Sequence, residues 1–234
     1  MTNSKQNNPK GQPWRLIPSD WENDCGHMSF DGSLYGGFED GDTPILRFFS
    51  FDKPTLTLGR IEARKLDLAR LEWPYEIRPT GGRAVLHGAG DLCYAVVASV
   101  KDLLVGGTLL ESYRKISSLL AAGLKGLGRK VELSGDRHRG LEGPHCFSAP
   151  SFGELTLEGR KVAGGAQARR GGVFLQQGVI LLSVDPGWSR LGGDVASTMV
   201  GLNDVPGLPP ISKAELEKSL TRAFSSAGIE FTTV

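Results

Sequence analysis

Glycine is the residue that most constrains this chain. It occupies 32 of the 234 positions, about twice its usual share of a globular protein. The glycines recur with no fixed period, which excludes a collagen helix and a solenoid of short repeats. Several stand in pairs, at Gly81-Gly82, Gly106-Gly107, Gly164-Gly165, Gly171-Gly172 and Gly192-Gly193. Because glycine adopts positive φ at little cost and lets the backbone approach a ligand closely, the pairs predict tight turns and candidate binding loops.

The length, composition and net charge of the chain limit the classes of protein to which it can belong. A chain of 234 residues can bury a sizeable core, and we expect a flexible tail at 1–13 followed by one domain at 14–234. An apolar share of 39% excludes a generally disordered chain, and a net charge of +1 argues against a nucleic-acid binder. With no apolar run long enough to span a membrane and no signal peptide, we expect a cytoplasmic monomer without a membrane partner.

The cysteines and histidines have no spacing that indicates a structural centre. Cys25, Cys93 and Cys146 form no C-x-x-C pair, so we expect free thiols in a reducing compartment. The four histidines show no metal-ligand spacing. The sequence therefore predicts neither a disulfide framework nor a metal site.

Two helices are indicated by their capping signals. TLLE at 108–111 and SKAE at 212–215 each place a hydroxyl three residues before a carboxylate, which is a capping box. Apolar residues at helical spacing follow both boxes, and Gly128 and Gly228 are expected to end the two helices.

Segments rich in β-formers lie before and between these helices. We expect strands at 44–51, 55–59, 75–78 and 92–99, and a meander over 153–184 with hairpin turns at 157–160 and 170–172. Because strands and helices do not alternate regularly, the sequence predicts an α+β fold in which mixed sheets are flanked by helices.

The first candidate site segment is RPTGGRAVLH at 78–87. Its two glycines expose backbone N–H groups, and Arg78 and Arg83 flank them. Such a loop could cradle a thioester arm, a phosphate or a carboxylate. An ordinary β-turn with solvated arginines, followed by a structural histidine at His87, explains the same pattern.

The second candidate segment is HCFSAPS at 145–151. Cys146 stands between a Gly-Pro and an Ala-Pro turn, on irregular backbone of the kind that often carries chemistry. A small buried side chain is the alternative interpretation of this cysteine.

The third candidate segment is GRKVAGGAQ at 159–167. Regular strand alternation places Lys161, Ala163 and Gly165 on one face, which suggests a narrow channel beside the ammonium group. A solvent-facing lysine on an edge strand is the alternative. The chain has no G-x-x-x-x-G-K-[ST], G-x-S-x-G or H-E-x-x-H motif.

Taken in order, three segments of the chain resemble the biotin/lipoate protein ligase and octanoyltransferase family. They are RFFSFDKPTLTLG at 47–59, RPTGGRAVLH at 78–87 and GRKVAGGAQARRGGVFLQQGVILL at 159–182. HCFSAPSFGELTLEGRK at 145–161 looks most like the cysteine-dependent octanoyltransferase branch, in which the cysteine before this meander carries the acyl group. The ATP-dependent lipoate ligases lack that cysteine and often carry an extra C-terminal domain.

The resemblance implies a single lipoate ligase-like domain and assigns roles to residues. Cys146 becomes the expected nucleophile and Lys161 the expected active-site lysine. The expected substrate-binding residues are Arg78, Gly81, Gly82, Arg83, His87, Gly164, Gly165, Ala166 and Gln177. The family often has G-S-A-Q where 164–167 reads GGAQ, L-Q-H-G-S where 175–179 reads LQQGV, and N-M-A-x-D where 27–31 reads HMSFD. These departures concern the polar groups around the acyl carbonyl.

The implied reaction moves an octanoyl group from acyl carrier protein to the lysine of a lipoyl-domain protein, such as the glycine cleavage H protein, with no cofactor. Transfer would pass through a Cys146 thioester, and the Lys161 ammonium would favour the thiolate and hold the oxyanion. His87, His145 and the departing thiolate are the candidate bases. Amidotransfer between lipoyl domains, ATP-dependent lipoate ligation and a non-catalytic acyl- or partner-binding module remain as alternatives.

Both expected protein substrates tend to be acidic, so basic residues near the site in sequence are candidates for docking them. These residues are Arg137, Arg139, Arg160, Arg169 and Arg170.

Overall fold

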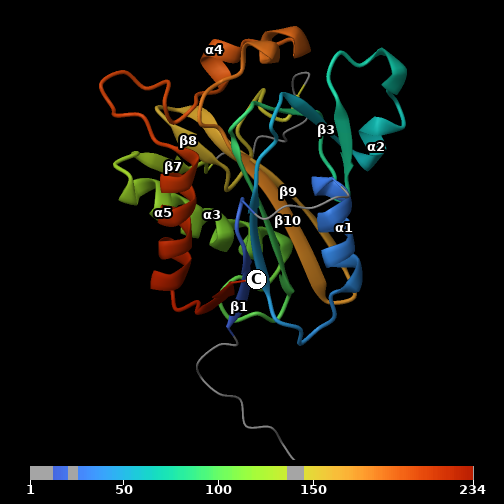
Figure 1. The fold of residues 1–234 in the computed structure, drawn as a ribbon, viewed down its shortest axis with the longest axis vertical. Coiled ribbons are helices and arrows are strands. Elements are labelled where there is room, and N and C mark those ends of the chain that lie inside the picture. The colour runs from blue at the N-terminus through green and yellow to red at the C-terminus, as the bar shows by residue number, and fades with distance from the viewer. Residues whose placement is uncertain (1–12, 21–25, 136–144, 234) are drawn as a thin grey trace, which may run out of the picture.

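The computed structural model describes residues 13–20, 26–135 and 145–233, and these residues form two β-sheets with helices around them (Figure 1). The large sheet has the strand order β11 (Phe231–Thr233), β1 (Trp14–Ile17), β2 (Ile45–Phe49), β6 (Leu92–Ser99), β10 (Val173–Ile180), β9 (Arg160–Arg170), β8 (Leu155–Leu157) and β7 (Val131–Leu133). The small sheet has the order β4 (Tyr75–Arg78), β3 (Thr55–Gly59) and β5 (Val85–His87).

Both sheets are mixed, as the sequence predicts. In the large sheet, the strands from β2 through β6, β10, β9 and β8 to β7 are antiparallel neighbours, whereas β1 runs parallel to both β2 and β11. In the small sheet, β3 is antiparallel to β5 and parallel to β4. The first and last described strands therefore lie side by side at one edge of the large sheet.

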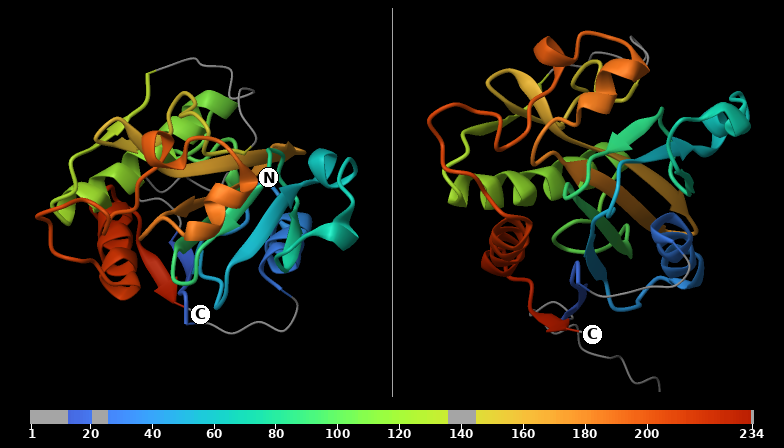
Figure 2. Two further views of the ribbon diagram at one scale, coloured as in Figure 1. Left: turned by 90° about the horizontal axis from the view of Figure 1, so that it is seen from above. Right: turned by 45° about the horizontal axis from the view of Figure 1, so that its top comes forward.

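The helices divide between the two faces of the large sheet. Helices α3 (Leu109–Gly126) and α5 (Lys213–Ser226) pack together on one face, and α1 (His27–Gly37) lies with the small sheet on the other (Figures 1 and 2). The shorter helices are α2 (Arg60–Ala63), α4 (Val195–Thr198) and the 3-10 turns Leu68–Arg70 and Pro186–Leu191. Phe48 and Phe49 show the division: Phe48 joins the core beneath α3 and α5, and Phe49 joins the core beneath α1.

The local signals for α3 and α5 are confirmed. The Thr108 hydroxyl and the Glu111 carboxylate cap α3 reciprocally, and Ser212 and Glu215 do the same for α5. Gly128 follows the end of α3 with a φ of 76°, in the left-handed region that ends helices. The hairpin turn at 157–160 and that at 170–172 are also confirmed, the latter with positive φ at Gly171 and Gly172.

Helix α1 is the longest of the described helices that the sequence did not predict. Its sequence, HMSFDGSLYGG, is rich in glycine and serine, which are weak helix formers. The helix is instead stabilised by tertiary contacts, because the Glu76 carboxylate of β4 accepts the backbone N–H groups of His27 and Met28 at its N-terminus. Because these contacts come from a distant strand, no capping residue of the α1 segment could have predicted them.

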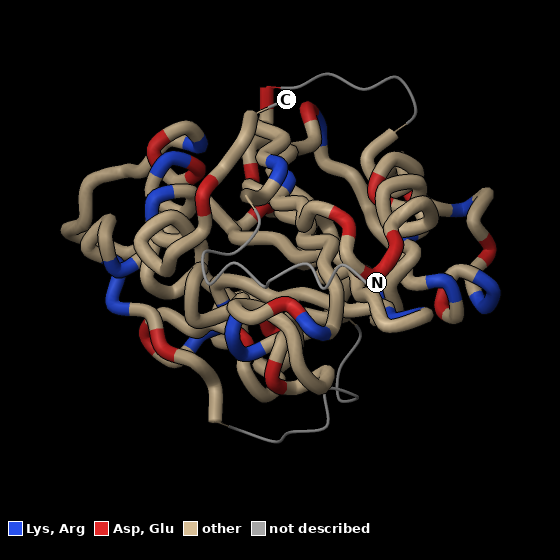
Figure 3. The backbone as a smooth tube through the Cα atoms, turned by 90° about the horizontal axis from the view of Figure 1, so that it is seen from below, with Lys and Arg blue, Asp and Glu red and all other residues tan. Residues whose placement is uncertain are grey.

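Charged residues of both signs are distributed over the fold without a block of one sign (Figure 3). Within the described ranges, no helix is long and apolar enough to cross a membrane.

Candidate active site

A cavity of about 250 Å³ lies where the large sheet, the small sheet and the turn at 145–148 meet. All of the predicted site residues except Gly81 line it, so the three sequence segments converge on one place. Its apolar wall was not predicted and includes Met28, Phe49, Val85, Phe147 and Val179. Gly81 lies just behind the wall, where its carbonyl oxygen accepts a hydrogen bond from Arg78.

Cys146 is partly exposed in this cavity, and its thiol contacts the glycine loop. The backbone N–H of Arg83 donates to Cys146 Sγ over 3.0 Å, and Sγ lies 3.2 Å from the Arg83 carbonyl oxygen, to which the thiol donates. The Cys146 backbone N–H also donates to Ala84. The thiol is therefore held against the backbone just after the paired glycines.

The loop needs glycine at position 82 for two reasons. Its φ is +99°, which side chains rarely adopt, and an added Cβ would lie 3.4 Å from Cys146 Sγ and 3.1 Å from Arg78 Nη2. Gly59 at the end of β3 is needed as well, because a Cβ there would lie 2.1 Å from the Gly82 carbonyl oxygen. These close approaches explain why a glycine-rich loop faces the thiol.

Lys161 is buried beside Cys146 rather than exposed on an edge strand. The residue is 1% exposed, and Nζ donates to the Cys146 carbonyl oxygen over 2.6 Å. The Glu154 carboxylate forms an ion pair with Nζ over 2.7 Å, and Glu154 also lines the cavity. Glu154 was missed at the sequence level, although a buried lysine requires a carboxylate partner and Glu154 directly precedes β8, the strand that pairs with Lys161.

Of the two residues predicted to line a channel beside Lys161, Gly165 lines the cavity and Ala163 does not. The register of β8 with β9 shifts between Leu155 and Thr156, which places one extra residue on β9 and interrupts the alternation. As a result Lys161 lies over Gly164, where an added Cβ would be 2.5 Å from its Cε. Ala163 belongs to the core instead.

His87 is buried and neutral. Burial lowers its pKa to about 3, and the nearby Arg78 charge acts in the same direction. Its Nε2 lies 2.8 Å from the Thr57 hydroxyl, and its Nδ1 lies 3.2 Å from Cys93 Sγ, so both ring nitrogens are occupied. Burial also raises the pKa of the Cys93 thiol well above its usual value. Cys25 lies outside the described residues.

His145 is also held by structural contacts. Its Nε2 lies 2.9 Å from the Gly192 carbonyl oxygen, to which it donates, and Nδ1 lies 3.3 Å from the Ser148 hydroxyl. Burial lowers its pKa below the ordinary value of histidine. Neither candidate histidine therefore presents a free basic nitrogen to the cavity.

Arg78 is a buried cation whose hydrogen bonds go to neutral oxygens. Nη1 donates to the carbonyl and the hydroxyl of Thr57 at 2.8 and 2.7 Å, and Nη2 donates to the Gly81 and Arg83 carbonyls at 3.1 and 2.8 Å. Because arginine only donates, the Thr57 hydroxyl accepts from Arg78 and donates to His87 Nε2. The His87 proton then resides on Nδ1.

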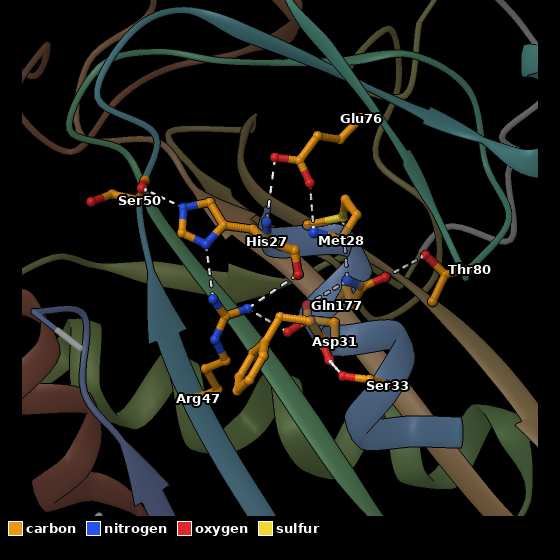
Figure 4. A network of polar contacts seen from close by, with 10 residues as sticks. His27, Met28, Asp31, Ser33, Arg47, Ser50, Glu76, Thr80 and Gln177 are labelled. Carbon is orange, nitrogen blue, oxygen red and sulfur yellow. Dashed lines mark hydrogen bonds and ion pairs between the residues drawn. The ribbon is translucent and has the colours of Figure 1, made fainter. Parts of the chain in front are cut away.

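A second polar cluster lies on the α1 side of the cavity (Figure 4). Asp31 is fully buried, and its two oxygens accept from Arg47 Nη1 and Gln177 Nε2, each at 2.5 Å. The Gln177 Oε1 accepts from Thr80 over 3.0 Å. Burial raises the pKa of Asp31 to about 6 against the opposing effect of Arg47. Gln177 thus joins α1 to the loop that follows Arg78.

The proposed docking arginines that the structure describes have partners within the chain. Arg169 donates to Gln167, Gly107 and Ser112, and Arg170 donates to Tyr35 and Gly36 at the end of α1. Arg160 donates to Glu158. Arg137 and Arg139 lie outside the described residues, and docking by any of these arginines stays a prediction.

Among the described residues, no group of three or more His, Cys, Asp and Glu side chains could hold a metal ion. The cavity presents one thiol, an ion-paired lysine and a buried arginine beside an apolar wall.

Residues 27–225 match the model of the lipoyl protein ligase A/B catalytic domain family, which is most of the chain and includes every residue of the cavity. This chain belongs to the lipoyl protein ligase A/B catalytic domain family. The resemblance found in the sequence motifs is thereby confirmed.

Curated members of the family are similar over much of the chain. The octanoyltransferase LipM of Carboxydothermus hydrogenoformans is 39% identical over 180 residues, which cover 74% of this chain and 66% of that protein. The octanoyltransferase LipM of Kyrpidia tusciae is 33% identical over 241 residues, which cover 92% of this chain and 87% of that protein. The matched part of the chain thus spans about two thirds of the first of these relatives.

Solved structures of the lipoyl protein ligase A/B type share the fold. A lipoate-protein ligase A bound with ATP superposes with a TM-score of 0.73 at 24% identity, covering 96% of this chain and 90% of that one. A lipoate protein ligase from T. acidophilum with bound lipoic acid gives a TM-score of 0.72 at 22% identity, covering the same shares. At these identities the likeness establishes the α+β fold.

The departure from the family pattern at Gly165 has a steric cause. An added Cβ would lie 2.7 Å from the Gln177 carbonyl oxygen and 2.9 Å from the Tyr94 hydroxyl, so a serine does not fit here. Gly178 on β10 has the same restriction, because a Cβ there would lie 2.5 Å from the Tyr94 ring. Tyr94 occupies the space that side chains at these two positions would need.

Proposed function

We propose that this chain is an octanoyltransferase that moves an octanoyl group from acyl carrier protein to the lysine of a lipoyl-domain protein through a Cys146 thioester. The observation that carries the proposal is the position of the partly exposed Cys146 thiol in the wall of an apolar cavity, beside the buried Lys161. The relatives named as octanoyltransferases support the same reaction.

The first step is attack of the Cys146 thiolate on the donor thioester. A new S–C bond forms, the carrier thiolate leaves from the tetrahedral intermediate, and Cys146 holds the octanoyl group. Exchange between two thioesters is close to isoenergetic, so this step needs no ATP. Lys161 stabilises the oxyanion of the intermediate, which its place in the cavity wall supports.

The second step is attack of the acceptor lysine amine on the Cys146 thioester. An amide bond forms and the Cys146 thiolate leaves. Because His87 and His145 have both ring nitrogens engaged, the departing thiolate is the proton acceptor that the site favours among the three candidates. The other amine proton stays on the amide nitrogen, and the proton that the lysine ammonium loses before the attack passes to solvent.

The acyl chain would lie along the apolar wall of Met28, Phe49, Val85 and Val179. Burying a methylene group stabilises a complex by about 0.8 kcal/mol, so an octanoyl tail brings roughly 5 kcal/mol of gross binding free energy. Gly164 and Gly165 on β9 line the same cavity and add no side chains that would narrow it.

Intact mass measurement tests the proposal. Wild-type protein, Cys146→Ala and Cys93→Ala are each incubated with octanoyl-acyl carrier protein in the absence of ATP. We expect one octanoyl adduct on wild type and on Cys93→Ala and none on Cys146→Ala, followed by transfer of the adduct to an added lipoyl domain.

Other outcomes identify the alternatives. Loading only from an octanoylated lipoyl domain would indicate amidotransfer, and modification of the lipoyl domain only with free octanoate and ATP would indicate ligation. Binding of the acyl donor with no transfer under any of these conditions would indicate a binding module.

A further inference from the structure

Two buried cations, Lys161 and Arg78, lie beside Cys146. They differ in whether a carboxylate of the described residues forms an ion pair with them. Lys161 is 1% exposed and forms an ion pair with Glu154 over 2.7 Å. The Glu154 carboxylate also accepts the Ser151 backbone N–H over 2.7 Å, which fixes it in place. The Lys161–Glu154 pair is close to neutral as a unit, so it attracts an anion at a distance only weakly. The third N–H of Nζ can still donate to an oxygen placed directly beside it.

Arg78 keeps its positive charge. It is 6% exposed, and among the described residues no carboxylate lies within ion-pair distance of it. Glu62 is the carboxylate that interacts with it at longer range. Its four hydrogen bonds reach carbonyl and hydroxyl oxygens, which orient the guanidinium without cancelling its charge.

Arg78 and the thiol share one acceptor. The Arg83 carbonyl oxygen lies 2.8 Å from Arg78 Nη2 and 3.2 Å from Cys146 Sγ. The positions of both groups around Gly82 confirm their proximity, since one added Cβ would touch Nη2 at 3.1 Å and Sγ at 3.4 Å. The Cys146 charge also counts among the causes that raise the pKa of Arg78 against the effect of burial.

We propose that Arg78, and not Lys161, supplies the positive charge that stabilises the Cys146 thiolate. When the S–H bond breaks, the proton passes to solvent and the Arg83 carbonyl loses the thiol as a donor. Arg78 Nη2 remains on that carbonyl and limits its repulsion of the sulfur anion, while the Arg83 N–H continues to donate to Sγ. Arg78 is thus a positioning residue that acts through the Arg83 peptide and through its charge.

This assignment gives Lys161 a different resting role. Its Nζ holds the Cys146 carbonyl and lies 4.5 Å from the centre of the Phe147 ring, so it fixes the turn that carries the thiol. The proposal rests on the proposed function only in taking Cys146 as the nucleophile. The ionisable groups that line the cavity besides Cys146 are Arg78, Arg83, His87, Glu154 and Lys161. Outside the lining, Glu62 acts on Arg78, Tyr113 interacts with Cys146, and His145 precedes Cys146 in the chain.

The test is the rate of Cys146 alkylation by iodoacetamide between about pH 6 and pH 9, read on the Cys146 peptide by mass spectrometry in a Cys25→Ala background. No acyl donor is present, so the result does not depend on the proposed transfer reaction. The variants are Arg78→Met, Arg78→Lys and the double variant Lys161→Met/Glu154→Gln, which removes the ion pair without leaving a lone buried charge.

We expect alkylation at pH 7 to slow about tenfold or more in Arg78→Met, with the pH midpoint of the rate moved upward. Arg78→Lys should restore part of the rate, because it keeps a charge but loses the fork. The double variant should react within about twofold of wild type. A tenfold fall in the double variant overturns the proposal, even where Arg78→Met does not fold. Unchanged alkylation in folded Arg78→Met also overturns it.

Discussion

Arg47 beside helix α1 and Arg78 beside the Cys146 thiol are both buried arginines. Each interacts with a histidine, but the two differ in the charge of their other partners. Arg47 donates to His27 Nδ1 and Arg78 reaches His87 through Thr57, so each arginine fixes the neutral tautomer of a histidine. Arg47 is paired with Asp31, whereas Arg78 has neutral partners.

This difference in partners gives the two arginines different roles, Arg47 in stabilising the fold and Arg78 at the reactive thiol. Gln177 donates to the second oxygen of Asp31, and the Arg47–Asp31 pair attaches α1 to β2. The two charges therefore neutralise each other and hold the helix in place. Arg78 has no ion-pair partner among the residues that the structure describes, and its charge lies at the cavity, where it can respond to an anion. A buried cation without a carboxylate partner is costly to keep, which makes its position beside a thiol informative.

Arg47→Met should have the largest effect on stability. It leaves the Asp31 carboxylate fully enclosed without its cation, and breaking a buried pair in this way costs about 3–5 kcal/mol of unfolding free energy. Arg78→Met should cost less, about 1–3 kcal/mol, because it leaves only neutral oxygens unpaired. Urea unfolding at pH 7 measures both.

The double variant Arg47→Met/Asp31→Asn is the control, and we expect it to be more stable than Arg47→Met alone. Equal losses in Arg47→Met and Arg78→Met would contradict the distinction between the two arginines.

Lys161→Ala should reduce the rate of octanoyl loading about 10²–10³-fold through loss of an oxyanion donor. It should also destabilise the fold, because Glu154 is left buried without its partner. The alternative interpretation of Lys161 as a solvent-facing lysine, whose replacement would leave stability unchanged, is wrong because Lys161 is 1% exposed. Lys161→Met/Glu154→Gln separates the two effects, since it should recover stability and not the loading rate.

Gly164→Ala tests the placement of Lys161 without removing it. The added Cβ would lie 2.5 Å from Lys161 Cε and should slow loading, whereas Gly32→Ala, which adds a Cβ with no atom within 4 Å, should not. Full activity in Gly164→Ala would mean that Lys161 need not occupy its present position.

The pH dependence of stability should reveal the neutral histidine beside Arg78. The pKa of His87 is lowered to about 3 in the fold, so below pH 6.5 the unfolded chain binds a proton that the folded one does not. Stability therefore falls as pH falls through this window, by about 2 kcal/mol at pH 5 from His87 alone. The pKa values of Asp31 and Asp91 are raised, to about 6 and about 7. These two groups therefore raise the stability as the pH falls, which opposes the effect of His87.

Comparison with His87→Gln isolates this contribution, because the two aspartates are common to both proteins. The wild-type stability should fall toward that of the variant between pH 7 and pH 5. Parallel curves for the two proteins over this range would show that His87 takes up a proton in the fold.

The sequence predicts the parts of this site that are local and misses those that are made by distant contacts. Capping boxes and paired glycines lie within a few residues, so α3, α5 and the loop at Gly82 are predictable. Helix α1 depends on Glu76 of another strand, and the placement of Lys161 over Gly164 depends on a register shift that no pattern in the chain specifies. The convergence of the motifs on one cavity was predictable only through the family resemblance.

The smallest expected effect is that of Gln177→His, at the residue that donates to Asp31 on the side opposite Arg47. Gln177→Leu leaves one Asp31 oxygen and the Thr80 hydroxyl without partners, at a cost of about 1–3 kcal/mol. Gln177→His, the residue that the family often has here, can still donate to Asp31 and should cost less than about 1 kcal/mol. Unfolding measurements on both variants compare them directly. If the histidine variant is as unstable as the leucine variant, both ends of the amide are required, and the Arg47 side of the molecule depends on a bridge to Thr80 as well as on its ion pair.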